Sequence, residues 1–158
     1  MSDMFVKLYA LPPLAPALEK LAAKKIEIRR ALVPEKSVVL KRIKEGEFPP
    51  SWNDECEIAF TRLPVSCFIA VSDGRVLGFS CYDSVMKGFF GPIGVLKEFE
   101  GKGIGKALLL SALHAMRAEG YGYAAIGWVA EPEFYRKCAG AQEIPDSLPG
   151  IYKGMLLH

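Results

Sequence analysis

The chain has 158 residues, of which 51% are hydrophobic, and this is the size of one ordinary globular domain. Its formal net charge is only +2 and its basic residues are scattered among acidic ones, so we expect no nucleic-acid partner. The apolar stretches fall short of the roughly 20 residues that span a bilayer, and the N-terminus lacks the pattern of a signal peptide. We therefore expect a single domain, residues 1–158, that is cytoplasmic and has no membrane partner.

The number and spacing of the cysteines further restrict the kinds of site that the sequence allows. The four cysteines are widely spaced, form no Cys-x-x-Cys pair and are accompanied by only two histidines. This pattern argues against a zinc site and against a disulfide framework. We expect no metal, and reduced thiols that are mostly buried, at Cys56, Cys67, Cys81 and Cys138.

The first third of the chain predicts short elements separated by proline and glycine. Strands are predicted at residues 5–11 and 26–30, and helices at 14–25, 34–44 and 51–62. Ser51 is a candidate N-cap for the last of these helices. Residues 1–25 are expected to be an N-terminal strand and helix that precede the main body.

The rest of the chain predicts antiparallel strands followed by a crossover. Asp73-Gly74 is typical of a hairpin turn, and the strand-helix-strand order after it requires two parallel neighbours. The predicted strands are 66–72, 75–83, 87–95, 123–129 and 152–157, and the helices are 103–119 and 132–138. We expect an α/β (α+β) fold with a mixed, mostly antiparallel central sheet and helices on both faces.

The strand through Phe89–Val95 is unusual because it contains Gly91, Pro92 and Gly94. Proline and glycine inside a strand indicate a bulge or an edge, and they predict that this strand separates from a neighbour partway along. Its free backbone groups could then pair with an extended ligand. The alternative is that Gly91-Pro92 turns a hairpin corner.

A glycine-rich loop, Glu100-Gly101-Lys102-Gly103-Ile104-Gly105-Lys106, leads directly into an apolar helical run. Alternate glycines before a helix N-terminus let several N–H groups point at one anion, and the helix dipole favours negative charge there. A P-loop is excluded because Glu100 stands at its first glycine and Ala107 at its Ser or Thr. The dinucleotide fingerprint lacks its third glycine, at Lys106. A plain strand-to-helix turn is the remaining alternative.

Together with its surroundings, this loop resembles that of the GCN5-related N-acetyltransferases (GNAT). The resemblance covers residues 26–157 and rests on Val95, the glycine loop, the helix after it, Ile126-Gly127-Trp128-Val129, and Phe134-Tyr135-Arg136-Lys137 before Gly140-Ala141. It implies a central sheet with splayed strands and acetyl-coenzyme A as co-substrate. It also implies a cofactor site that comprises Ile93, Gly94, Val95, Glu100, Gly101, Lys102, Gly103, Ile104, Gly105 and Lys106.

The same resemblance implies two roles and one departure from the family pattern. The backbone around Ile93–Val95 would face the thioester carbonyl, and Tyr135 would protonate the coenzyme A sulfur. Glu100 stands where the family has Arg or Gln. A carboxylate beside a pyrophosphate is repulsive and costs on the order of 1 kcal/mol or less at an exposed loop, so we expect weaker coenzyme A binding.

A general base is not evident from the sequence. Deprotonation of the amine could pass through water or use Asp83, Glu55 or Glu57, while His114 is more typical of a packing residue. Trp52 and Trp128 either wall the acceptor or fill the core. We expect transfer of an acetyl group to a primary amine of a small molecule or peptide, with a non-catalytic coenzyme A binding module as the alternative and a homodimer as an open option.

Overall fold

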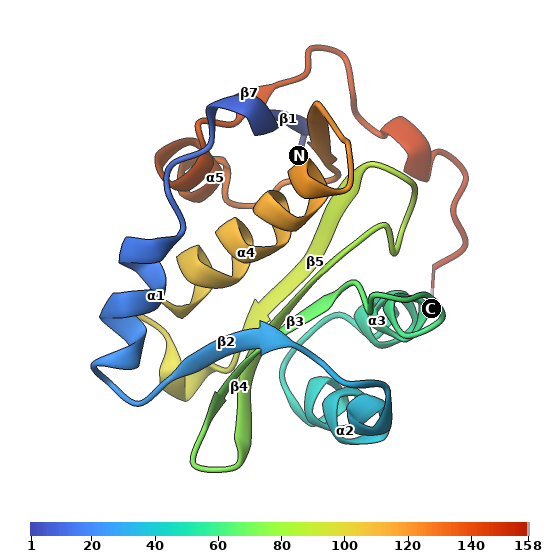
Figure 1. Ribbon diagram of the computed structural model, residues 1–158. Helices are drawn as coiled ribbons and strands as arrows, with labels where there is room; N and C mark the ends of the chain where they lie inside the picture. Colours follow the sequence, from blue (N-terminus) through green and yellow to red (C-terminus); the bar gives the residue numbers. More distant parts are fainter. Residues whose placement is uncertain (158) are drawn as a thin grey trace.

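A twisted sheet forms the centre of the computed structural model, which describes residues 1–157 (Figure 1). Within these residues it has seven strands in the order β2-β3-β4-β5-β6-β1-β7. All neighbours are antiparallel except β5 and β6. The strands are β1 (Met4–Lys7), β2 (Glu27–Arg30), β3 (Cys67–Ser72), β4 (Arg75–Tyr82), β5 (Phe89–Val95), β6 (Tyr123–Ile126) and β7 (Gln142–Glu143). The predicted mixed, mostly antiparallel sheet is confirmed.

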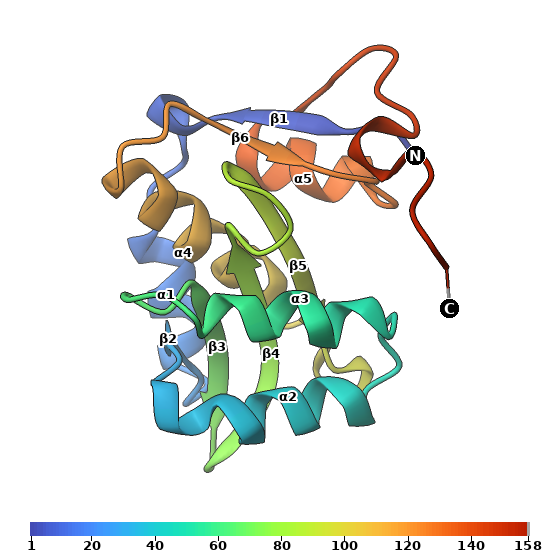
Figure 2. The same ribbon diagram turned by 90° about the vertical axis from the view of Figure 1, so that its right-hand side faces the viewer.

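Helices cover both faces of the sheet, as predicted. The pair α2 and α3 lies on one face, and α1 and α4 lie on the other (Figure 2). The helices are α1 (Ala15–Ala22), α2 (Lys36–Glu45), α3 (Ser51–Ala59), α4 (Ile104–Ala118) and α5 (Pro132–Ala139). In the stretch from residue 1 to residue 157, no helix is both long and apolar enough to cross a membrane.

The alternation along β3 shows why separate hydrophobic clusters form on the two faces of the sheet. Cys67 and Ile69 point to the α2–α3 face, whereas Phe68 and Ala70 point to the α1–α4 face, because successive strand side chains alternate. Leu108, in the second turn of α4, is fully buried in the cluster on the α1–α4 face. Burial of such a side chain is worth roughly 1.5–3 kcal/mol, so α4 is fixed firmly against the sheet.

The N-terminal strand is an integral part of the sheet. β1 pairs with β6 through Met4↔Ile126 and on its other edge with β7 through Met4↔Glu143. Val6 is completely buried. Residues that we expected to precede the main body therefore supply an inner strand, which runs across the direction of β3 and β4 in Figure 2.

The predicted strand at residues 152–157 is wrong. The structure has a 3-10 helix at Gly150–Tyr152, and no strand in the described residues after it. Gly150 and Gly154 adopt positive φ angles of 59° and 76°, which interrupt an extended conformation. The sheet position beside β6 is moreover occupied by β1.

Other differences concern the ends of elements. β6 stops at Ile126 instead of 129, because Trp128 adopts a left-handed backbone with a φ of 48° that turns the chain out of the sheet. Pro50 is the residue that precedes α3, and no side chain caps this helix, so the prediction of a Ser51 cap is wrong.

Candidate functional site

The glycine loop connects the end of β5 to the start of α4. Gly101 and Gly103 have φ angles of 78° and 90°, which side-chain-bearing residues adopt only at a cost of about 1–2 kcal/mol. A Cβ atom added at Gly101 would meet nothing within 4 Å. Glycine is therefore required by the turn itself, and the space in front of the loop is open.

The start of α4 directs unpaired donors toward that space. The first bond back along the helix runs from the Ala107 N–H to the Gly103 carbonyl, at 3.3 Å. The N–H groups of Ile104, Gly105 and Lys106 precede it and have no acceptor within the helix. Such a cluster of N–H groups at the positive end of a helix dipole is suited to bind an anion.

A basic cavity of about 360 Å³ lies beside the loop. Lys24, Arg75 and Lys102 line it together with Phe99. The Lys24 ammonium donates a hydrogen bond to the Lys102 carbonyl at 3.1 Å, and the Arg75 guanidinium lies 5.7 Å from the centre of the Phe99 ring. The cavity therefore combines three positive charges with an aromatic face.

β5 is anchored along one edge and is paired over a short distance along the other. Its register with β6 includes Phe89 and Phe90, and β6 ends there while β5 continues to Val95. On the β4 edge, the Leu96 N–H donates to the Leu77 carbonyl at 2.9 Å. Because backbone groups alternate between the two edges of a strand, Ile93 and Val95 direct their N–H groups away from β4.

A bulge interrupts β5 at the predicted place. Cys81 of β4 is opposed by both Gly91 and Pro92, since the register shifts between Ser80 and Tyr82. The prediction of a bulge is confirmed, and the hairpin corner is excluded because β5 runs through Gly91-Pro92. The extra residue increases the local twist where the pairing with β6 stops.

The absence of a side chain at Gly94 allows the Phe48 ring, which belongs to the α2–α3 layer, to approach β5 closely. A Cβ atom there would lie 2.6 Å from the Phe48 ring and 2.8 Å from the Phe79 ring. Trp52 of α3 stacks on Phe48 with ring centres 5.6 Å apart. Trp52 therefore packs against the core between α3 and β5. Of the two roles that the sequence left open for it, acceptor wall or core residue, this contact supports the second.

Tyr135 lies where β5 and β6 pair. Its ring packs against Phe90, with centres 6.4 Å apart, and against Phe134 on the same helix. Phe134 in turn approaches Gly105, because a Cβ atom there would lie 3.5 Å from its ring. Burial and then the negative charge of Glu131 raise the pKa of Tyr135 to about 12, so the phenol stays protonated at neutral pH.

The three carboxylates that the sequence offered as bases have different surroundings in the structure. Asp83 accepts hydrogen bonds from Arg62, Tyr121 and the Gly88 N–H at 2.8–2.9 Å, and it is held as a structural anchor. Glu57 is exposed and pairs with Lys36 at 2.8 Å. Glu55 lies half-buried on α3, where burial raises its pKa, and unlike Asp83 and Glu57 it pairs with no cation among residues 1–157.

His114 has a structural role. Its Nε2 atom lies 2.8 Å from the Pro12 carbonyl, so it fastens α4 to the segment before α1. This contact agrees with the packing role that the sequence indicated.

Tyr152 is the residue that sequence reasoning missed. A Cβ atom on Gly127 would lie 2.7 Å from the Tyr152 hydroxyl, and the rings of Tyr152 and Trp128 have centres 4.5 Å apart. Burial, followed by the charges of Glu55 and Asp3, raises the pKa of Tyr152 to about 12. Tyr152 therefore packs on Trp128 just after β6 and also lies close enough to Glu55 of α3 for the charge of that residue to raise its pKa.

Asp3 fixes the same corner from β1's side. Its carboxylate accepts a hydrogen bond of 3.0 Å from the Trp128 N–H. The Trp128 indole N–H is buried and has no hydrogen-bond partner within residues 1–157. A buried donor without a partner is uncommon in native proteins, and it lies beside Tyr152.

Comparison with solved structures defines the class of fold. The chain superposes on an N-acetyltransferase region of a fungal multi-domain β-N-acetylglucosaminidase (TM-score 0.73, 15% identity, 90% of this chain and 19% of that one). It also superposes on a GCN5-related N-acetyltransferase from Sphaerobacter thermophilus (TM-score 0.66, 19% identity, 90% and 48%). A third match is a GNAT acetyltransferase from Brucella melitensis in complex with acetyl-CoA (TM-score 0.54, 20% identity, 76% and 91%). These likenesses show an acetyltransferase fold.

The family follows from the sequence itself. Residues 38–140, more than half of the chain, match the model of the acetyltransferase (GNAT) family. The chain therefore belongs to the GNAT acetyltransferase family, and the resemblance is confirmed. Among curated protein sequences, none matches this chain. The chain spans less than half of the length of the first two solved structures that it resembles.

Gly127→Ala tests the Tyr152 corner. The new methyl group would meet the Tyr152 hydroxyl at 2.7 Å, so we expect the Tyr152 ring to leave Trp128 and the tryptophan fluorescence to shift. Gly122→Ala is the matched control, because a Cβ atom there meets nothing within 4 Å. An unchanged spectrum in Gly127→Ala would contradict the placement of Tyr152.

Proposed function

We propose that the protein is an acetyl-coenzyme A dependent N-acetyltransferase that acts on a primary amine of a small molecule or a peptide. The observation that carries the proposal is the open glycine loop, Gly101–Lys106, which follows β5 and a 3-10 helix at Lys97–Phe99. The pairing of β5 with β6 stops at Phe90. Coenzyme A offers a pyrophosphate to such a loop and an extended thiol-bearing arm to such a strand. Family membership supports the same ligand, as does the complex of the Brucella protein with acetyl-CoA.

The loop residues fit a pyrophosphate. The N–H groups of Ile104, Gly105 and Lys106 provide donors, and the open space at Gly101 admits a ligand close to the backbone. The adjacent cavity supplies Lys24, Arg75 and Lys102 for the remaining phosphate charge of a coenzyme A molecule. These cations also offset the exposed carboxylate of Glu100.

The arm would lie along β5, between it and β6. We assign the N–H groups of Ile93 and Val95 to this ligand, since both are directed away from β4. Gly94 contributes by allowing the close approach of Phe48 from the α2–α3 layer and of Phe79 from the neighbouring strand β4. The bulge at Gly91 and Pro92 supports a separation of β5 from β6 at this point.

The bound thioester supplies an activated acetyl group, and the chain's own residues handle charge and protons. The amine nitrogen forms a bond to the acetyl carbon while the carbon–sulfur bond breaks. An N–H group in Ile93–Val95 stabilises the negative charge that develops on the carbonyl oxygen. Tyr135, whose phenol is protonated at neutral pH, donates its proton to the leaving sulfur, and the proton that the attacking nitrogen loses passes through water to the phenolate.

Glu55 is the residue that we assign to the acceptor amine. It is half-buried and pairs with no cation among residues 1–157, whereas Asp83 is already held by three donors and Glu57 by Lys36. Its negative charge raises the pKa of Tyr152, which packs on Gly127 just after β6. A carboxylate at this place would attract a cationic amine and orient it toward the acetyl group.

Glu100→Gln tests the pyrophosphate site. Removal of the repulsive carboxylate is expected to tighten coenzyme A binding about two- to fivefold at low salt, measured by calorimetry. Glu98→Gln is the control, because Glu98 is also exposed but its nearest cation is Arg42, at 3.8 Å. Unchanged or weaker affinity of Glu100→Gln would refute the repulsion argument.

Tyr135→Phe tests catalysis apart from binding. Loss of the proton donor is expected to lower kcat about 10²- to 10⁴-fold, with the coenzyme A dissociation constant retained. Turnover is followed as thiol release across a library of primary amines, with Tyr123→Phe as an exposed control. Wild-type turnover in Tyr135→Phe eliminates this role. Coenzyme A binding by the wild-type protein without thiol release from any amine would favour a non-catalytic binding module.

Glu55→Gln tests the acceptor site. Because the amide keeps the size but not the charge, KM for a cationic amine is expected to rise roughly tenfold while coenzyme A affinity stays unchanged. Glu57→Gln, two residues along the same helix, should leave KM at the wild-type value. Equal effects of the two substitutions would show that only the general acidity of α3 matters.

A further inference from the structure

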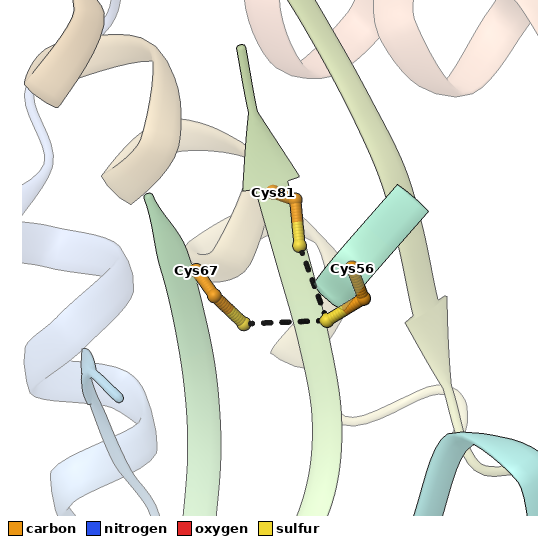
Figure 3. A group of neighbouring side chains, drawn as sticks. All are labelled: Cys56, Cys67 and Cys81. Carbon is orange, nitrogen blue, oxygen red and sulfur yellow. Dashed lines mark hydrogen bonds between the residues drawn. The ribbon is translucent and has the colours of Figure 1, made fainter. Parts of the chain in front are cut away.

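Three cysteines that are far apart in the sequence converge in the α2–α3 core. Cys56 comes from α3, while Cys67 and Cys81 are directly opposite each other in β3 and β4. The Cys56 sulfur lies 3.9 Å from that of Cys67 and 3.5 Å from that of Cys81 (Figure 3). All three sulfurs lie within 4.8 Å of one another. The wide spacing of these cysteines in the sequence gives no sign of the cluster.

The surroundings of the cluster are apolar and closed. Each of the three residues has an exposed fraction of 0%, and their neighbours in this core include Ala59, Ile69 and Phe79. All three thiols are free, as the sequence predicted. Among residues 1–157, no histidine, aspartate or glutamate joins the group as a further donor.

The distances between the sulfurs match those around a bound ion. Sulfurs about 2.3 Å from a common centre lie about 3.8 Å apart in a tetrahedral arrangement and about 4.0 Å apart in a trigonal one. Two of the three separations, 3.9 and 3.5 Å, are close to these values, and the third is no more than 4.8 Å. Free buried cysteines that only fill space need not point their sulfurs at one another.

We propose that Cys56, Cys67 and Cys81 form a binding site for one thiophilic ion that is satisfied by three sulfur donors. Thiolates select soft ions, and structural zinc would require a fourth ligand that the described residues do not supply. A water molecule would be a poor fourth ligand, because a buried water needs two to four polar partners of its own. Trivalent arsenic and Cu(I) both accept three sulfurs.

The buried setting favours the ion that leaves no net charge. Three neutral thiols and one neutral arsenous acid molecule, As(OH)₃, give a neutral three-sulfur complex and three waters. Three S–H bonds and three As–O bonds break, three As–S bonds and three O–H bonds form, and no oxidant or reductant is consumed. Cu(I) with two or three thiolates would carry a negative charge, which costs free energy in a low-dielectric core.

Occupancy of the site would join α3 to the β3–β4 hairpin. The ion would bond to one side chain of the helix and two of the hairpin, and an ion that binds only the folded state stabilises it. The cluster is fully buried, so entry requires local opening of α3, and binding must be measured after long equilibration. The site stands independently of the proposed acetyl transfer.

The test uses the reduced, full-length protein without oxygen, equilibrated with arsenite, Cu(I) or Zn²⁺ in separate arms. We expect one arsenic per chain by native mass spectrometry and a higher unfolding temperature. Cys56→Ala, Cys67→Ala and Cys81→Ala should each lose this binding, and Cys138→Ala, whose cysteine lies on α5 outside the cluster, should retain it. Cu(I) binding that depends on the same three cysteines would also support the site and identify the other ion.

A second measurement covers variants that do not fold. In the wild-type protein, slow alkylation mapped by peptide should be suppressed by arsenite at Cys56, Cys67 and Cys81, and not at Cys138. The proposal is overturned if neither arsenite nor Cu(I) binds once per chain, if binding survives the alanine substitutions, if the three cysteines are not protected, or if Zn²⁺ binds more tightly than both.

Discussion

The reversal of the chain between β5 and α4 is the constraint on which the rest of the structure depends. After β5 and a 3-10 helix at Lys97–Phe99, two glycines with positive φ angles, Gly101 and Gly103, turn the chain into a helix whose first N–H groups have no acceptors within the helix. β4 fixes the direction of β5 through its ladder, and the apolar side chains of α4 fix the helix against the sheet. The loop is therefore held from both ends by elements that cannot shift independently of the core.

Asp3, near the start of the chain, and Tyr152, in the last 3-10 helix, meet near the start of β5. β1 forms an inner strand beside β6, and Asp3 holds the Trp128 backbone where the chain leaves the sheet. Tyr152, from the last 3-10 helix, packs on the same tryptophan. The negative charge of Glu55 on α3 reaches this corner, where it raises the pKa of Tyr152. Residues from four separate parts of the sequence therefore define the surroundings that we assign to the acceptor amine.

Local signals predicted the elements well and long-range partners poorly. The Asp73-Gly74 turn, the bulge at Gly91-Pro92 and the glycine loop each depend on backbone conformations that only a few residues adopt, and all three were found. The strand expected at residues 152–157 fails because pairing depends on β1, which is distant in sequence. The thiol cluster was missed for the same reason, since Cys56, Cys67 and Cys81 meet only through the packing of α3 on a hairpin.

The most direct test of the central claim is a crystal structure of the protein with acetyl-coenzyme A. Our account predicts the pyrophosphate within hydrogen-bond distance of the N–H groups of residues 104–106, and the thiol-bearing arm alongside Ile93 and Val95, with Tyr135 near the sulfur. A complex in which the ligand lies away from the loop, or in which β5 and β6 stay paired along the whole arm, would contradict it.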